Sequence, residues 1–134
     1  MGRPLRCRAL IVDDDDSVRF VLRRALSGSG WRVADVSDGA EVEQRLQREP
    51  FDLVLLDLYM PGMNGFEVLR RLRRHDQQVL PEWKTAADVK VLVISAANTE
   101  GLDFARRIGA DAYLNKPFEI ADVLRTVKEL SEAG

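Results

Sequence analysis

Five polar side chains stand at or just after the ends of apolar runs, and their types suggest shared chemistry. Asp13 and Asp14 follow the run ALIV, and Asp57 follows LVLL. Ser95 follows VLVI, and Lys116 comes two residues after AYL. If these runs are parallel strands, their carboxyl ends share one edge of a sheet, where such folds bind ligands. The sequence therefore predicts that carboxylates, a hydroxyl and an ammonium group gather at that edge.

This set of groups is suited to phosphoryl chemistry. Carboxylates held a few ångströms apart repel one another, and a hard divalent cation with oxygen ligands relieves that repulsion. Lys116 would then hold a phosphate oxygen, and Ser95 would donate a hydrogen bond to another. We expect Mg²⁺, or Mn²⁺ in its place, as the cofactor.

Each of these residues also has a simpler structural interpretation. Aspartates cap the free amide groups of a helix N-terminus, and we expect Asp15 or Asp16 to do so for the first helix. Asp57 alone would suit a turn in MPGMNG, Ser95 a strand end and Lys116 a solvated surface. Their coincidence at successive strand ends favours a shared site over separate roles.

The elements that must position these groups follow from hydrophobic spacing. Apolar runs typical of buried strands alternate with segments whose apolar residues recur at helical spacing. Strands that alternate with helices and are apolar throughout predict an α/β fold with a doubly wound parallel sheet. The expected strands are 9–12, 31–36, 53–56, 91–94 and 112–114, and the expected helices lie around 18–26, 42–46, 66–72, 102–108 and 120–130.

The connection between the third helix and the fourth strand is longer than the others. It covers about residues 75–89, and Pro81 with its polar neighbours predicts a surface loop. We expect Trp83 in this loop to offer a partner surface. Removal of residues 77–87 should then spare phosphorylation and weaken a partner contact.

Composition limits the class of protein. A chain of 134 residues predicts a single domain, 1–134, and a net charge of -2 argues against direct binding of nucleic acid. No apolar run is long enough to span a membrane, and the N-terminus lacks the apolar core of a secretion signal. The lone Cys7 forms no internal disulfide. We expect a cytoplasmic protein without membrane contact.

The sequence resembles the receiver domain of two-component response regulators from about Arg8 to Leu130. The motifs that carry the resemblance are LIVDDDDSVR, DLVLLDLYMPGMNGFEVLRRLR, VLVISA and GADAYLNKPF, in this order. The family implies a flavodoxin-like fold with a five-stranded parallel sheet, strand order 2-1-3-4-5, and five helices. It also implies a phosphoprotein of signal transduction, which promotes only its own phosphorylation and dephosphorylation and is not otherwise an enzyme.

By this resemblance, Asp57 takes a phosphoryl group from a phosphohistidine of a sensor histidine kinase or a histidine phosphotransfer protein. Asp13 and Asp14 match the acidic pair that positions the metal, and the backbone carbonyl of Tyr59 matches a further ligand. Lys116 matches the lysine of the site, and its bond to Pro117 matches a cis peptide of the family.

The resemblance also implies a switch. Ser95 matches the hydroxyl that moves toward the phosphoryl group, and Tyr113 matches the aromatic residue that follows it. The face formed by the fourth helix, fifth strand and fifth helix would then change its packing and bind a downstream target protein. A homodimer is also expected of some receivers, although Ala112 stands where DNA-binding receivers often carry an acid.

Two residues next to the expected phosphoryl group differ from those that would favour its rapid hydrolysis. Tyr59 follows Asp57 by two positions, and Ala97 follows Ser95 by two. Neither offers an acid or amide that would orient water, so we expect a long-lived phosphoryl group.

Other interpretations remain open at this point. The chain is either a stand-alone receiver or the excised receiver of a larger DNA-binding or enzymatic regulator. A Mg²⁺-dependent phosphatase with an aspartyl nucleophile is a third hypothesis, and Tyr59 stands where such enzymes usually have a second acid.

The basic residues at the end of the third expected helix have a simple structural interpretation. Arg70, Arg71, Arg73 and Arg74 predict a solvated face, with contact to an acidic partner as the alternative. His75 is expected to be a solvated helix-end residue and not a phosphoacceptor or metal ligand.

Overall fold

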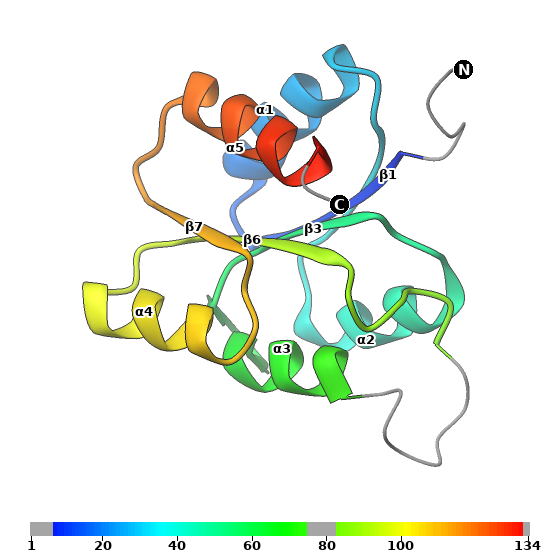
Figure 1. Ribbon diagram of the computed structural model, residues 1–134, viewed down its shortest axis with the longest axis vertical. Helices are drawn as coiled ribbons and strands as arrows, with labels where there is room; N and C mark the ends of the chain where they lie inside the picture. The colour runs from blue at the N-terminus through cyan, green and yellow to red at the C-terminus, as the bar shows by residue number, and fades with distance from the viewer. Residues whose placement is uncertain (1–6, 75–82, 133–134) are drawn as a thin grey trace.

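The computed structural model describes residues 7–74 and 83–132. Within this part of the chain, five parallel strands form one sheet in the order β2-β1-β3-β6-β7 (Figure 1). This is the predicted order 2-1-3-4-5. The strands are β1 Arg8–Val12, β2 Arg32–Val36, β3 Leu53–Leu56, β6 Lys90–Ser95 and β7 Ala112–Asn115, and the helices are α1 Asp16–Gly28, α2 Gly39–Arg48, α3 Gly65–Arg74, α4 Thr99–Arg107 and α5 Ile120–Glu132.

Helices cover both faces of the sheet. Figure 1 shows α1 and α5 on one face and α2, α3 and α4 on the other. The central strand β3 is buried throughout: Val54 and Leu56 join the core under α2, α3 and α4, and Leu53 and Leu55 join the core under α1 and α5. Alternate residues of a strand point to opposite faces, so LVLL has no polar position because both faces are covered.

The loop after β3 contains a feature that the sequence did not predict. Two short antiparallel strands, β4 Tyr59–Met60 and β5 Met63–Asn64, form a hairpin there. Gly65 then begins α3 so close to the residues that follow β3 that a Cβ would lie 2.5 Å from the Cα of Leu58. The turn-rich segment MPGMNG therefore brings the chain back against its own strand end.

Asp15 is the cap of α1, as predicted. Its side chain accepts hydrogen bonds from the backbone amides of Ser17 at 2.8 Å and Val18 at 3.2 Å. Capping satisfies donors that a helix leaves open at its start. Asp13 and Asp14 are thus left for another role.

The prediction that Trp83 lies on a surface loop is wrong. Trp83 is only 9% exposed and belongs to the core under α2 and α3. Thr85 is fully buried, and its hydroxyl oxygen accepts a hydrogen bond from the amide of Phe51 at 3.1 Å. Removal of residues 77–87 would therefore open the core, so its predicted effect on a partner contact alone no longer holds. Residues 75–82, including His75, lie outside the described part.

The prediction of a solvated face is also wrong for Arg73, although Arg71 and Arg74 are exposed as expected. The Arg73 guanidinium donates to the carbonyl oxygens of Ala87, Val89 and Gly109 and to the carboxylate of Asp111, at 2.6–3.0 Å. These acceptors belong to segments that follow α3 by many residues, so helical spacing alone gave no sign of them.

Among the described residues, no helix combines the length and the apolar character that crossing a bilayer requires.

Candidate functional site

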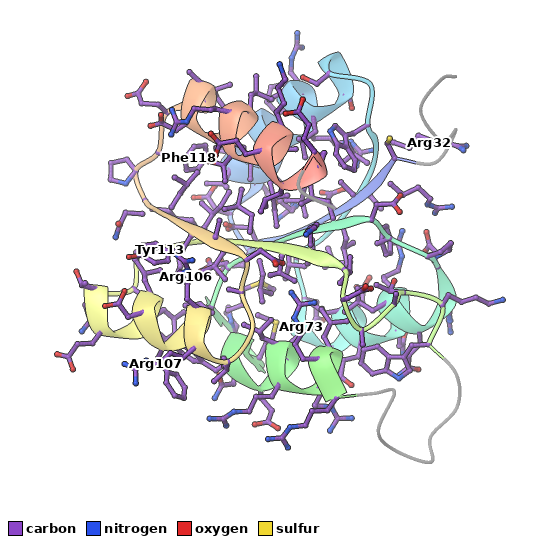
Figure 2. All side chains as sticks on the ribbon, in the orientation of Figure 1. Arg32, Arg73, Arg106, Arg107, Tyr113 and Phe118 are labelled. Carbon is purple, nitrogen blue, oxygen red and sulfur yellow. The ribbon has the colours of Figure 1, made fainter. Side chains whose placement is uncertain are left out.

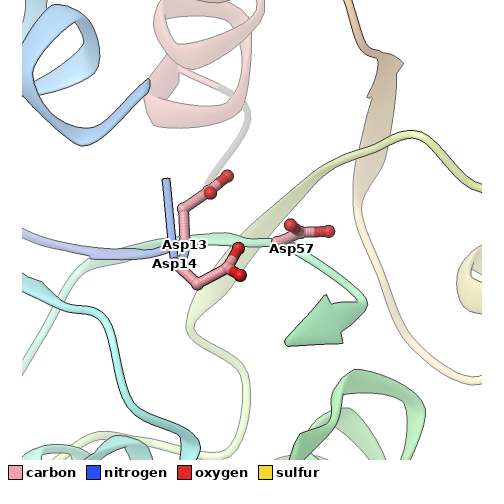
Figure 3. A group of neighbouring side chains, drawn as sticks. All are labelled: Asp13, Asp14 and Asp57. Carbon is pink, nitrogen blue, oxygen red and sulfur yellow. The ribbon is translucent and has the colours of Figure 1, made fainter. Parts of the chain in front are cut away.

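Three carboxylates meet at the carboxyl edge of the sheet, as the strand-end argument predicts. One oxygen each from Asp13, Asp14 and Asp57 lies within 4.8 Å of the others (Figure 3). The register explains the meeting, because Val12 of β1 pairs with Leu56 of β3 and each is followed by an aspartate. Asp13 is 2% exposed and Asp57 6% exposed, whereas Asp14 is open to solvent.

Lys116 reaches this acidic group from β7. Its Nζ lies 2.7 Å from Oδ2 of Asp13 and 3.0 Å from Oδ2 of Asp57. β6 separates β7 from β3 in the sheet, and the long lysine side chain spans that distance. The bond between Lys116 and Pro117 is cis, which confirms the prediction from the family.

The charges of this site do not balance. Burial raises the pKa of Asp13, and its hydrogen bond to Lys116 offsets this only in part. Burial also works to lower the pKa of Lys116, but hydrogen bonds to Asp13 and Asp57 outweigh it and raise that pKa. A charged lysine thus faces three acids, and the local excess is negative.

A magnesium ion fits this donor set. The available ligand atoms are carboxylate oxygens, two groups are held in place by burial, and the exposed Asp14 leaves a side open to water. Mg²⁺ prefers such oxygen ligands and retains part of its hydration shell. The role of the Tyr59 backbone carbonyl as a further ligand stays a prediction.

Ser95 ends β6 beside Asp57. Val93 pairs with Leu56 in the register of β3 and β6, so Ser95 lies just past the level of Asp57. The serine is fully buried, and its Oγ accepts a hydrogen bond from the amide of Ala97 at 3.3 Å. Its hydroxyl proton remains available for donation.

Tyr59 contacts Asp57 through its backbone, and its side chain reaches toward the first turn of α4. Its amide lies 3.3 Å from Oδ1 of Asp57, while the side chain is 57% exposed. Its hydroxyl is 3.7 Å from the point where a Cβ on Gly101 would lie, in the first turn of α4. Ala97, the other predicted modulator, is buried.

Tyr113 connects β7 to α4. Its hydroxyl donates a hydrogen bond to the Asp103 carboxylate at 3.2 Å, and Figure 2 shows the residue on the side of β7 that faces α4. The ring is partly buried against the core under α4. The switch role of Tyr113 stays a prediction.

Sequence reasoning missed two aromatic residues near the site. Phe66 on α3 contacts Tyr59, and Phe104 on α4 contacts Phe66. Helical spacing places Phe66 in the third expected helix and carries no signal of its contact with Phe104, which lies 38 residues later in the chain.

Comparison with known proteins gives one consistent family. The family model described as response regulator receiver domain matches residues 9–128. The proteins named response regulator MprA from Mycobacterium leprae (strain TN) and Mycobacterium avium (strain 104) are 38% and 37% identical to the chain over 128 residues. In both cases the match covers 92% of this chain and 50% of the relative. The chain thus spans about half the length of the curated relatives it matches.

Solved structures give the same result. A CheY-like receiver domain protein from Methanospirillum hungatei JF-1 has a TM-score of 0.79 and 30% identity, with 95% of each chain covered. The response regulator TrrA from Thermotoga maritima, solved in complex with Mg²⁺-BeF, has a TM-score of 0.76 and 28% identity. That match covers 92% of this chain and 98% of the other.

Proposed function

We propose that this chain, which belongs to the response regulator receiver domain family of two-component systems, takes a phosphoryl group from a phosphohistidine onto Asp57. The observation that carries the proposal is the meeting of Asp13, Asp14 and Asp57 within 4.8 Å, with Lys116 bonded to two of them. Receiver domains bind Mg²⁺ at such an acidic pocket and act in signalling with a histidine kinase and a downstream effector.

The chemistry needs positioning and charge cancellation. An oxygen of Asp57 attacks phosphorus, the P–O bond forms as the P–N bond of phosphohistidine breaks, and the imidazole leaves with the electron pair. Bound Mg²⁺ would neutralise charge on the transferred group. Asp13 and Asp14 would hold that ion, and Lys116 would exchange its bond to Asp57 for one to a phosphoryl oxygen.

Phosphorylation then biases two packings of the face formed by α4, β7 and α5. The phosphoryl group adds a charge of about -2 next to Ser95, and the Ser95 hydroxyl donates a hydrogen bond to this group. Rotation of Tyr113 inward would break its bond to Asp103 on α4. The bias itself comes from the contact between Ser95 and the phosphoryl group, because phosphate shifts only states that differ in their contacts with it.

Tyr59 and Ala97 give the phosphoryl group a long lifetime. Ala97 is buried and apolar, and Tyr59 places a phenol where an acid or amide would orient water. Tyr59→Asn and Ala97→Glu should each speed the loss of phosphate from the purified protein. A decay unchanged by both substitutions would overturn this part of the proposal.

The proposed partners are a histidine kinase or phosphotransfer protein as donor and a downstream target protein. A homodimer is also proposed. Since the match covers only half of the relatives' length, a receiver within a larger regulator remains the second candidate. A phosphatase finds less support, because Tyr59 occupies the position of its second acid.

The test is incubation with acetyl phosphate and Mg²⁺, followed by intact mass and size-exclusion chromatography. Wild type should gain one phosphate in the presence of Mg²⁺ and none with excess chelator, and Asp57→Asn should gain none. Equal labelling of wild type and Asp57→Asn would refute the assignment, and the elution volume reports dimerisation.

A further inference from the structure

A row of aromatic rings leads from the site to the exposed side of α3 and α4. The rings of Tyr59 and Phe66 meet edge to face with centroids 6.2 Å apart, and those of Phe66 and Phe104 are 5.5 Å apart. The Arg70 guanidinium closes the row 5.4 Å from the centroid of Phe104. The proposed chemistry uses only the first of these residues.

The position of Tyr59 matters because its side chain crosses between two strand ends. Its backbone follows β3, where Asp57 lies, and its hydroxyl reaches Gly101 in the α4 helix that follows β6. A Cβ at Gly101 would be 3.7 Å from that hydroxyl and 3.3 Å from the Cβ of Ala97. Both residues expected to control water access therefore converge on the first turn of α4.

A phenol that is 57% exposed has few contacts to keep it there. The Tyr59 ring packs against the ring of Phe66, and Phe66 is itself braced by Phe104 from α4. Edge-to-face aromatic pairs have a preferred geometry that an aliphatic side chain does not reproduce. The exposed phenol thus depends on Phe66 for its orientation.

We propose that Phe66 is a positioning residue that holds the Tyr59 phenol across the mouth of the site. It thereby lengthens the lifetime of the phosphoryl group on Asp57. In hydrolysis, a water oxygen attacks phosphorus opposite Asp57, and the bond from phosphorus to the aspartyl oxygen breaks. Inorganic phosphate and the free carboxylate result, and the water proton passes to phosphate or solvent. The held phenol hinders that approach of water. This inference rests on the proposed function of Asp57.

The variants isolate this role. Phe66→Leu removes the ring but keeps an apolar side chain in the helix, and Phe66→Tyr keeps the ring. Phe104→Leu removes the brace and should give a smaller effect in the same direction. Phe20→Leu is the matched control, since Phe20 is an exposed phenylalanine of α1, 61% accessible, outside this row.

The experiment loads each protein with acetyl phosphate and Mg²⁺, removes the donor by desalting and follows the decay by intact mass. We expect Phe66→Leu to lose phosphate about twofold to tenfold faster, the range that one aromatic contact supplies. Phe66→Tyr and Phe20→Leu should decay like wild type. Urea unfolding of each protein confirms that it is folded under the assay conditions.

A double-variant comparison separates positioning from a general loosening of the fold. If Phe66 acts through the phenol, Phe66→Leu has no further effect in a Tyr59→Ala background. The inference is overturned if Phe66→Leu decays like wild type, or if it speeds decay equally with and without Tyr59. Should Phe66→Leu fail to fold, Phe104→Leu with and without Tyr59→Ala decides by the same criteria. A wild type that takes no phosphate would refute the proposed function instead.

Discussion

Two partly buried charge clusters lie at opposite edges of the same sheet, and they are built differently. At the edge near the start of β6, Arg73 meets three carbonyl oxygens and the carboxylate of Asp111, which also accepts from the amide of Val91. At the other edge, Lys116 meets Asp13 and Asp57, with Asp14 nearby. In the first cluster Asp111 offsets the charge of Arg73, and the second keeps an excess of negative charge that a bound cation would balance.

This difference separates a structural cluster from a reactive one. Burial lowers the pKa of Arg73 while Asp111 opposes the shift, and arginine stays charged in either case. Its five donors find acceptors inside the protein, so nothing is left for a ligand. The carboxylate oxygens beside Lys116 still have lone pairs that can bind a ligand, and metal binding requires this.

The largest expected effect is on the reactive cluster. Lys116→Met should slow phosphorylation by acetyl phosphate by about a hundredfold or more, because it removes a preorganised charge from the transferred group. The rate is measured by intact mass against time at saturating Mg²⁺. A rate within a few-fold of wild type would show that the bonds from Lys116 to Asp13 and Asp57 are structural only.

The matching change in the balanced cluster should affect stability instead. Arg73→Met leaves three carbonyl oxygens and the carboxylate of Asp111 without their donor, so the free energy of unfolding should fall by about 3 kcal/mol. Urea unfolding followed by tryptophan fluorescence measures it. Phosphorylation of the folded variant should proceed at the wild-type rate, and Arg74→Met on the exposed side of α3 is the control.

A smaller and opposite effect on stability is expected when one acid is neutralised. Asp13→Asn removes a buried charge whose burial is unfavourable, so without Mg²⁺ the free energy of unfolding should rise by about 1 kcal/mol. Mg²⁺ binding, measured by calorimetry, should weaken by about tenfold or more. Loss of stability together with unchanged Mg²⁺ affinity would contradict the description of this cluster as over-acidic.

The smallest effect belongs to a third, more exposed cluster, in which Arg45 and Arg8 bind Glu49. The pKa of Glu49 is lowered below 4.5, and the hydrogen bond from Arg45 is the largest cause. The folded state therefore binds fewer protons there, and the stability from Glu49 is present above pH 4.5 and lost as pH falls through the lowered pKa.

Urea unfolding of wild type and Glu49→Gln from pH 7 to pH 3 measures this contribution. Above pH 4.5, wild type should be more stable than Glu49→Gln by less than about 1 kcal/mol. The difference should vanish once the pH falls below the lowered pKa of Glu49. A difference that grows as pH falls would reverse the sign of the proposed interaction.

The sequence by itself determined the elements and the members of the acidic site. Continuous apolar runs such as LVLL indicated strands covered on both faces, and Asp15 carried a local capping signal. Because parallel strands end at one edge, the order of the chain alone predicted that Asp13, Asp57 and Lys116 meet. The strand order itself came from the family resemblance.

Only the tertiary structure decided which polar and aromatic side chains are buried and what they contact. Arg73 resembles its exposed neighbours in sequence, but its acceptors come from residues 87 to 111. Trp83 sits among polar residues and still packs into the core, and the two-residue strands β4 and β5 are too short for periodicity to reveal. Spacing along the chain reports which face a residue takes within its own element, whereas contacts between distant elements depend on how those elements pack.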